Sequence, residues 1–149
     1  MVSAIQAALL HCLWANGGSP SLYVQVVCLP AVRSKWEEEL PKLAIFTKSA
    51  SFGIISRTGS LEHKAVMENL RQARVLIIDD AHNFLNPNSN RSQQLTKHRA
   101  DCVLLASAVP INRSSQDLLR LMELLDLKNL EEDQLAILKN SISRLSTAD

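Results

Sequence analysis

Two adjacent carboxylates follow an apolar run near the middle of the chain. Residues 75–78 read Val-Leu-Ile-Ile, and Asp79, Asp80, Ala81 and His82 come directly after them. If the run is a strand of a parallel sheet, the first carboxylate can join the magnesium shell of a bound nucleotide. The second can orient the water that attacks a phosphoryl group. The same residues also fit a solvated strand end before a turn, so the acidic pair alone leaves both interpretations open.

Four short apolar runs are candidates for the strands that would position these acids. The runs are rich in Val, Ile and Leu and do not alternate with polar residues, which is typical of strands buried on both faces. The predicted strands cover residues 23–29, 52–55, 75–78 and 102–106.

Segments with helical start signals lie between and after these runs. Ser34 stands three residues before Glu37, as in a capping box, and Pro41 would end that helix. Ser60 opens the next predicted helix, and residues 83–92 predict a polar loop. Two further helices are predicted from about residue 114 to 147, with start signals at Ser114, Asp117, Asn129 and Glu132. Alternating strands and helices predict an α/β fold with a parallel sheet, in one domain over residues 1–149.

Composition and charge narrow the class of protein. The chain has 149 residues, 46% hydrophobic and 21% charged, which is ordinary for a soluble globular domain. The net charge of +1 argues by itself for no polyanionic partner, so nucleic-acid binding would need a local basic patch. Cys12, Cys28 and Cys102 form no CxxC pair, which favours a reducing, cytoplasmic setting over a zinc or disulfide framework.

The first residues favour a helix over a signal peptide. Residues 4–15 are mostly apolar, but no Lys or Arg precedes Arg33, so the positive region of a signal peptide is missing. No stretch is long and apolar enough to predict a membrane span.

Three motifs follow one another along the chain. Residues 26–30 end in proline, and a Trp-Glu segment follows at 34–40. The acidic residues 79–82 are followed by Asn83 and by Asn86-Pro87, and residues 104–112 read Leu-Leu-Ala-Ser-Ala-Val-Pro-Ile-Asn, with Gln-Asp-Leu at 116–118. In this order the motifs resemble those of the Swi/Snf-type branch of the superfamily 2 helicases, whose acidic box reads DEAH and whose coupling box reads threonine-alanine-threonine-proline. The resemblance implies the first RecA-like lobe, of the three-layer P-loop NTPase type, with ATP, magnesium and DNA as ligands.

The resemblance also implies roles for individual residues. Asp79 matches the magnesium-coordinating acid and Asp80 matches the catalytic glutamate. His82 matches the histidine that links the nucleotide state to the next motif, and Ser107 matches the first threonine of the coupling box.

A second set of residues matches the family's DNA-facing loop. Pro30, Ala31 and Arg33 lie where the family places its first contact with the DNA backbone, and a DNA-binding chain would be nucleoid-associated. Trp36 is better interpreted as a core anchor than as a base-stacking platform. A basic stretch fits either a phosphate-facing patch or a solvated helix; it consists of Arg91, Lys97, His98 and Arg99.

Departures from the family pattern predict a degenerate or truncated lobe that is inactive alone. No Gly-Lys-Thr phosphate loop occurs, and residues 1–14 resemble the helix that follows that loop. We therefore expect an incomplete sheet that lacks the phosphate-loop strand, and weak binding of ATP and magnesium. Asp80 is one methylene shorter than glutamate, and Val109 lacks the hydroxyl of the coupling box. The family's second lobe, with its arginine finger, is also absent.

Other functions fit parts of this pattern. One is half of a split ATPase, with the phosphate loop supplied by a second polypeptide. Another is a non-catalytic module that binds nucleic acid or protein and keeps only the fold. A phosphoacceptor receiver domain also has an aspartate pair after a strand, but its pair lies near the start of the domain rather than in mid-chain.

Overall fold

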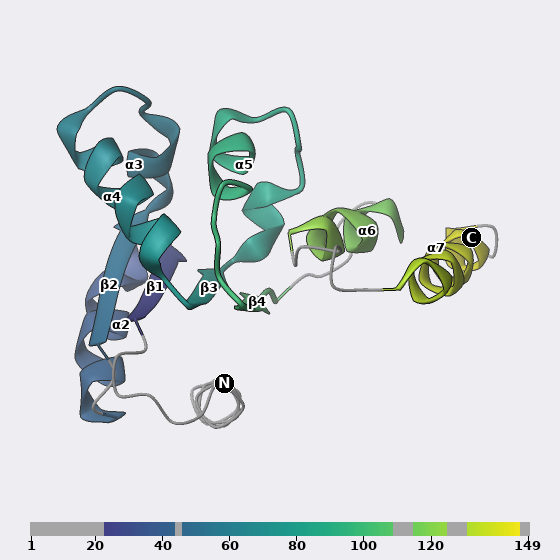
Figure 1. Ribbon diagram of the computed structural model, residues 1–149, viewed down its shortest axis with the longest axis horizontal. Helices are drawn as coiled ribbons and strands as arrows, with labels where there is room; N and C mark the ends of the chain where they lie inside the picture. The colour runs from purple at the N-terminus through teal and green to yellow at the C-terminus, as the bar shows by residue number, and fades with distance from the viewer. Residues whose placement is uncertain (1–22, 44–45, 109–114, 125–130, 147–149) are drawn as a thin grey trace.

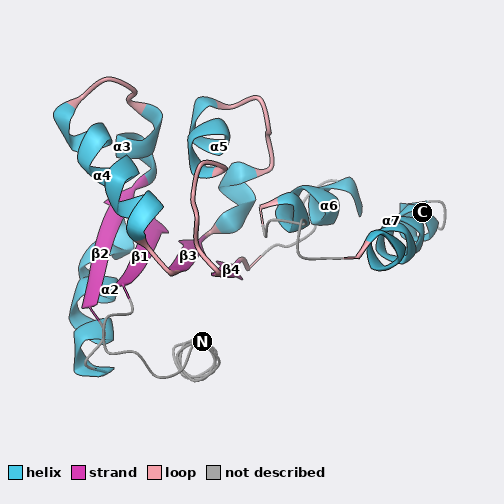
Figure 2. Ribbon diagram, in the orientation of Figure 1, coloured by secondary structure: helices cyan, strands magenta, loops and turns pink. Residues whose placement is uncertain are grey.

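A computed structural model describes residues 23–43, 46–108, 115–124 and 131–146. These residues contain a four-stranded sheet in the order β2-β1-β3-β4, in which every pair of neighbouring strands is parallel. The strands are β1 (Tyr23–Cys28), β2 (Phe46–Ser51), β3 (Val75–Asp79) and β4 (Cys102–Ala106), and helices connect them (Figures 1 and 2). The predicted α/β fold with a parallel sheet is confirmed.

One strand prediction is wrong. Residues 52–55 are not a strand but belong to helix α3 (Phe52–Ser56), and the strand β2 lies just before them. Phe52 and Ile55 are buried three residues apart, a spacing that places them on one face of a helix but on opposite faces of a strand. The apolar run therefore fitted a strand buried on both faces equally well. β2 was missed because it is an edge strand that carries Thr, Lys and Ser, so it has no apolar run.

The helix after β1 starts earlier than its predicted cap. A short 3-10 helix, η1 (Pro30–Val32), leads directly into α2 (Arg33–Glu39), and a second one, η2 (Leu40–Leu43), follows it. The N-cap of α2 is Val32, and no side chain caps it, so the predicted capping box at Ser34 is wrong. Pro30 opens the turn immediately after the strand, because its fixed φ suits the first position of a helix.

The next helices are short or capped by serine. Ser60 caps α4 (Leu61–Gln72) and accepts a hydrogen bond from the His63 amide, as its sequence position predicted. The predicted polar loop at 83–92 is partly helical instead, since it contains part of η3 (Ala81–Phe84) and the start of α5 (Asn90–Leu95). Ser89 caps α5 by accepting from the Ser92 amide, a start signal that the Asn-rich composition concealed.

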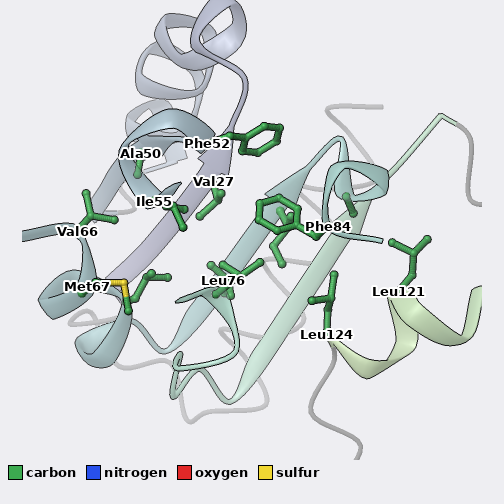
Figure 3. Packing of buried hydrophobic residues seen from close by; sticks show 14 residues of the cluster. Val27, Ala50, Phe52, Ile55, Val66, Met67, Leu76, Phe84, Leu121 and Leu124 are labelled. Carbon is green, nitrogen blue, oxygen red and sulfur yellow. The ribbon is translucent and has the colours of Figure 1, made fainter. Parts of the chain in front are cut away.

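Apolar side chains cover both faces of the sheet, which gives a three-layer arrangement. On one face, β1 and β3 pack against Leu40 and the partly buried Trp36, which come from the α2–η2 segment. On the other face lies a larger cluster from the sheet, α3, α4, η3, α5 and α6 (Figure 3). Within it the Phe52 and Phe84 rings meet edge to face, with centroids 5.0 Å apart.

Two helices follow β4, where helices were predicted. These are α6 (Ser115–Glu123) and α7 (Glu132–Ser146); Leu121 and Leu124 of the α6 segment join the larger core, whereas α7 lies farthest from the sheet (Figure 1). The predicted start signals Ser114 and Asn129 lie outside the described residues, as do residues 1–22. None of the helices that the structure describes is long and apolar enough to cross a membrane.

Candidate functional site

The acidic box and the coupling box meet at one edge of the sheet. Asp79 is the last residue of β3, and the strand register pairs it with Ala106, the last residue of β4. Ser107 follows Ala106 directly, so Asp79 and Ser107 stand at the C-terminal ends of neighbouring strands. In parallel α/β sheets this edge is where ligands bind.

His82 connects the two boxes. It lies in η3, and its Nδ1 atom is 3.4 Å from the Ser107 hydroxyl oxygen. Its Nε2 atom lies 3.4 Å from the side-chain nitrogen of Asn83. His82 and Ser107 are both partly buried, and their contact joins η3 to the residue that follows β4.

Both oxygens of the Asp79 carboxylate accept hydrogen bonds. The indole nitrogen of Trp36 donates to Oδ2 at 2.9 Å, and the backbone amide of Asp80 donates to Oδ1 at 3.0 Å. The sequence marked Trp36 only as a core anchor, and it does pack against the smaller core. Its bond to Asp79 was missed because nothing in the local pattern pairs residues 43 positions apart.

Asp80 has an unusual backbone. Its φ of 53° and ψ of 48° lie in the left-handed region, and it is the one non-glycine residue with positive φ in the described part of the chain. Asp and Asn adopt this region more readily than other non-glycine residues. The Asp80 carbonyl accepts bonds from the amide and the side chain of Asn83, both at 3.0 Å. These bonds hold the turn in which the chain leaves β3.

Cys28 is a further residue of this edge that the sequence did not indicate as functional. It ends β1, next to β3, and is fully buried. Burial, and secondarily the negative charge of Asp79, raise the pKa of the Cys28 thiol to about 11. The thiol is therefore uncharged and unreactive at neutral pH, and its packing role is structural.

The residues expected to face DNA lie on the turn after β1. Pro30 and Ala31 are exposed, whereas Arg33 is partly buried. The Arg33 Nε atom donates to Oε1 of Glu37 at 3.1 Å and to the Ser49 hydroxyl at 2.7 Å. Ser49 also donates to Glu37; this bond, together with Arg33, lowers the pKa of the Glu37 carboxyl. Arg33 is thus held in place beside a carboxylate.

The basic stretch 91–99 contacts its own segment and, through Arg91, the ring of Phe52 in α3. Arg91 lies over the Phe52 ring, 6.0 Å from its centroid, and Lys97 donates to the Gln94 side chain at 2.9 Å. The His98 ring accepts a bond from the Ala100 amide at 3.2 Å. These contacts fit the interpretation of the stretch as a solvated helix end.

The family follows from a comparison with known protein families. The profile described as SNF2-related domain matches residues 24–146. The chain belongs to this family. Among solved structures, the SNF2-related domain is similar to the Sulfolobus solfataricus SWI2/SNF2 ATPase core in complex with dsDNA, with 17% sequence identity and a TM-score of 0.60. No curated protein matches the sequence closely enough to count as a relative.

The similarity to the solved structure concerns the fold and only part of the other molecule. It covers 90% of this chain but 35% of the Sulfolobus chain, so the SNF2-related domain spans about a third of that protein's length. The four-stranded parallel sheet flanked by helices therefore matches part of a RecA-like SNF2 ATPase core.

Asp79 fits one position in a magnesium shell. Its two oxygens have lone pairs beyond those that accept from Trp36 and Asp80. Magnesium in nucleotide sites takes one or two carboxylates, and phosphates and water supply the other ligands. Among the residues that the structure describes, no group of three or more His, Cys, Asp or Glu could hold a metal ion alone.

Two of the predicted departures from the family pattern concern Val109 and residues 1–14. Both lie outside the residues that the structure describes.

Proposed function

We propose that this SNF2-related domain is a degenerate ATP-binding lobe of a Swi/Snf-type DNA-dependent ATPase, and that the 149-residue chain does not hydrolyse ATP alone. The supporting observation is the assembly of Asp79, His82 and Ser107 at the C-terminal edge of β3 and β4. A solvated strand end would not require the imidazole of one box to contact the hydroxyl of the next.

The chemistry that this edge would serve in a complete lobe is hydrolysis of the terminal phosphate of ATP. Water adds to the γ-phosphorus while the bond to the bridging oxygen breaks, which yields ADP and phosphate and releases a proton. Asp79 would hold the magnesium ion, which neutralises charge on the phosphates. Asp80 would have to orient the water, but it is shorter than glutamate and leaves the strand with a left-handed backbone. The His82–Ser107 contact would carry the nucleotide state toward the residues after β4.

DNA is the proposed macromolecular partner, through the exposed turn after β1. Residues 30–33, called here the 30–33 segment, follow the end of β1 and include the exposed Pro30 and Ala31 and the cation of Arg33. The similar Sulfolobus ATPase core was solved in complex with dsDNA, which supports the same class of partner. Phosphate contacts of this kind carry no base specificity.

An ATPase measurement tests the catalytic part of the proposal. The 149-residue chain is expected to show no turnover above background with magnesium, with or without duplex DNA, because phosphoryl transfer depends on positioning and charge neutralisation. No Gly-Lys-Thr loop occurs within residues 1–149, and Asp80 is shorter than the glutamate it would have to replace. Magnesium- and DNA-dependent turnover that disappears in an Asp79→Ala variant would show that the proposal is wrong.

DNA binding tests the other part. We expect salt-sensitive binding of duplex DNA, measured by fluorescence anisotropy, and weaker binding by Arg33→Ala. Lys42→Ala is the matched control, because Lys42 is a cation in η2, beyond the opposite end of α2, and already pairs with Glu39 at 2.8 Å. Equal losses in both variants would mean that the 30–33 segment is not the contact.

A second candidate is half of a split ATPase, complemented by a separate chain that carries a phosphate loop. It is favoured by β4, which ends the described sheet with apolar residues that are only partly buried. An upstream reading frame that ends in Gly-Lys-Thr, and ATP turnover on mixing the two chains, would support it. If no such reading frame exists, and DNA or protein binds with the same affinity in the presence and absence of nucleotide, the result would instead support a non-catalytic binding module.

A further inference from the structure

Helix α2 is anchored to two different strands. Near its start, the Arg33 Nε atom donates to Ser49 of β2 at 2.7 Å. One turn later, the Trp36 indole donates to Asp79 at the end of β3 at 2.9 Å. β1 lies between β2 and β3 in the sheet, so α2 spans β1 and binds the strands on both sides of it.

The two anchors differ in what they hold. Ser49 is nearly buried, and it forms a closed set of bonds with Arg33 and Glu37 that fixes the first turn of α2. Trp36 packs beside Val32 against the core residues of β1 and β3 while its nitrogen reaches the carboxylate. A bond from a neutral N–H to an ionised carboxylate is stronger than one between neutral groups. The acid of the candidate nucleotide site and the exposed 30–33 segment are therefore attached to the same seven-residue helix.

We propose that Trp36 is a positioning residue that ties the 30–33 segment to the Asp79 carboxylate through α2. This proposal rests on the proposed function in one respect, the ligands whose binding the link would communicate. DNA would bind the 30–33 segment, and nucleotide with magnesium would bind at Asp79. Movement of the segment shifts Trp36, and Trp36 moves or releases one oxygen of Asp79. The other oxygen stays bonded to the Asp80 amide, so the carboxylate rotates about a fixed point.

The indole proton of Trp36 reports directly on this link. The chain has two tryptophans, so its nitrogen–proton NMR spectrum contains two indole signals, and the one lost in Trp36→Phe belongs to Trp36. Asp79→Leu, which has nearly the same size but no acceptor, is expected to speed exchange of the Trp36 indole proton with solvent by at least about tenfold. Asp79→Asn keeps an acceptor oxygen and should restore most of the protection, which also guards against a variant that fails to fold. Asp101→Leu, which removes an exposed acid paired with Arg74, is the control and should leave the signal unchanged.

The other anchor is tested in the same spectrum. Arg33→Ala removes the bond to Ser49 and is expected to move the Trp36 indole signal and speed its exchange, whereas Lys42→Ala should do neither. The proposal would be overturned if the Trp36 indole proton exchanged at the wild-type rate in Asp79→Leu. It would also be overturned if Arg33→Ala changed neither the position nor the exchange rate of the Trp36 indole signal.

Titration with a short DNA duplex separates the link from the function. If anisotropy shows that the duplex binds, the Trp36 indole signal must shift, and a bound duplex that leaves it unmoved would overturn the link. If no duplex binds, the proposed DNA contact fails, and the Asp79→Leu and Arg33→Ala spectra still decide whether Trp36 ties the two regions together.

Discussion

The backbone of Asp80 limits which residues the turn after β3 can accommodate. Its left-handed backbone suits Asp or Asn, and the position resembles that of a catalytic glutamate. Asp80→Val is expected to lower the free energy of unfolding by about 1–2 kcal/mol, because a β-branched residue clashes in this region. Asp80→Asn, the control, should stay within about 0.5 kcal/mol of the wild type. Urea unfolding measures both, and an equal effect of the two variants would mean that the turn is not strained.

The Cys28 thiol is expected to make the free energy of unfolding decrease as the pH rises into the alkaline range. Its folded-state pKa of about 11 lies above the unfolded value of 9.0, so the thiol stays protonated longer in the folded state. The contribution is fully present below pH 9 and is lost as the pH rises toward 11, since the unfolded state then releases the proton first. The expected loss is at most about 3 kcal/mol.

Other groups also titrate in this range, so a matched variant isolates the thiol. Cys28→Ala should begin less stable, because it removes buried sulfur, but its stability should fall less steeply over the same pH interval. Urea unfolding at several pH values gives both slopes. Parallel slopes would show that Cys28 does not titrate in the way its burial beside Asp79 implies.

At the scale of elements, the caps of α4 and α3 provide a direct comparison. Ser60 accepts a bond of 3.0 Å from the His63 amide at the start of α4, whereas Ser51 caps α3 without a side-chain bond. Ser60→Ala is expected to lower the free energy of unfolding by about 1 kcal/mol, and Ser51→Ala by much less. Thermal or urea unfolding of the two variants checks this, and equal losses would contradict a capping role for Ser60.

For the whole molecule, β4 is the part of the described sheet that we expect to govern association with another chain. β4 ends the described sheet, and its residues are all partly buried, whereas the first four residues of β3 are fully buried. Unpaired apolar edges template pairing with another chain. We expect the isolated chain to be marginally stable and to self-associate at micromolar concentration, or to require a partner that supplies a strand. Sedimentation measures the association.

Hydrogen exchange tests whether β4 is the strand edge that causes the self-association. Amides of residues 103–105 should exchange faster than those of residues 76–78, because β3 is paired on both sides within the sheet. A monomer in which both strands are equally protected would mean that another segment of this chain covers β4.

The sequence by itself determined the parallel α/β fold and the edge at which the candidate site lies. Runs of Val, Ile and Leu mark β1, β3 and β4. In β1 and β3 these runs reflect burial on both faces, which leaves no solvated side to carry polar residues. Asp79 and Ser107 each follow such a run, and the C-terminal ends of parallel strands meet at one edge. Their juxtaposition was therefore predictable without coordinates.

Only the tertiary structure decided β2, α3 and the contacts of Asp79. β2 carries polar residues because it lies at the edge of the sheet, and its position as an edge strand is a property of the assembled sheet rather than of local sequence. The bonds of Trp36 to Asp79 and of Arg33 to Ser49 join residues 43 and 16 positions apart. No local periodicity encodes such pairs, because they exist only after α2 has packed across β1 and brought two strands within reach of one helix.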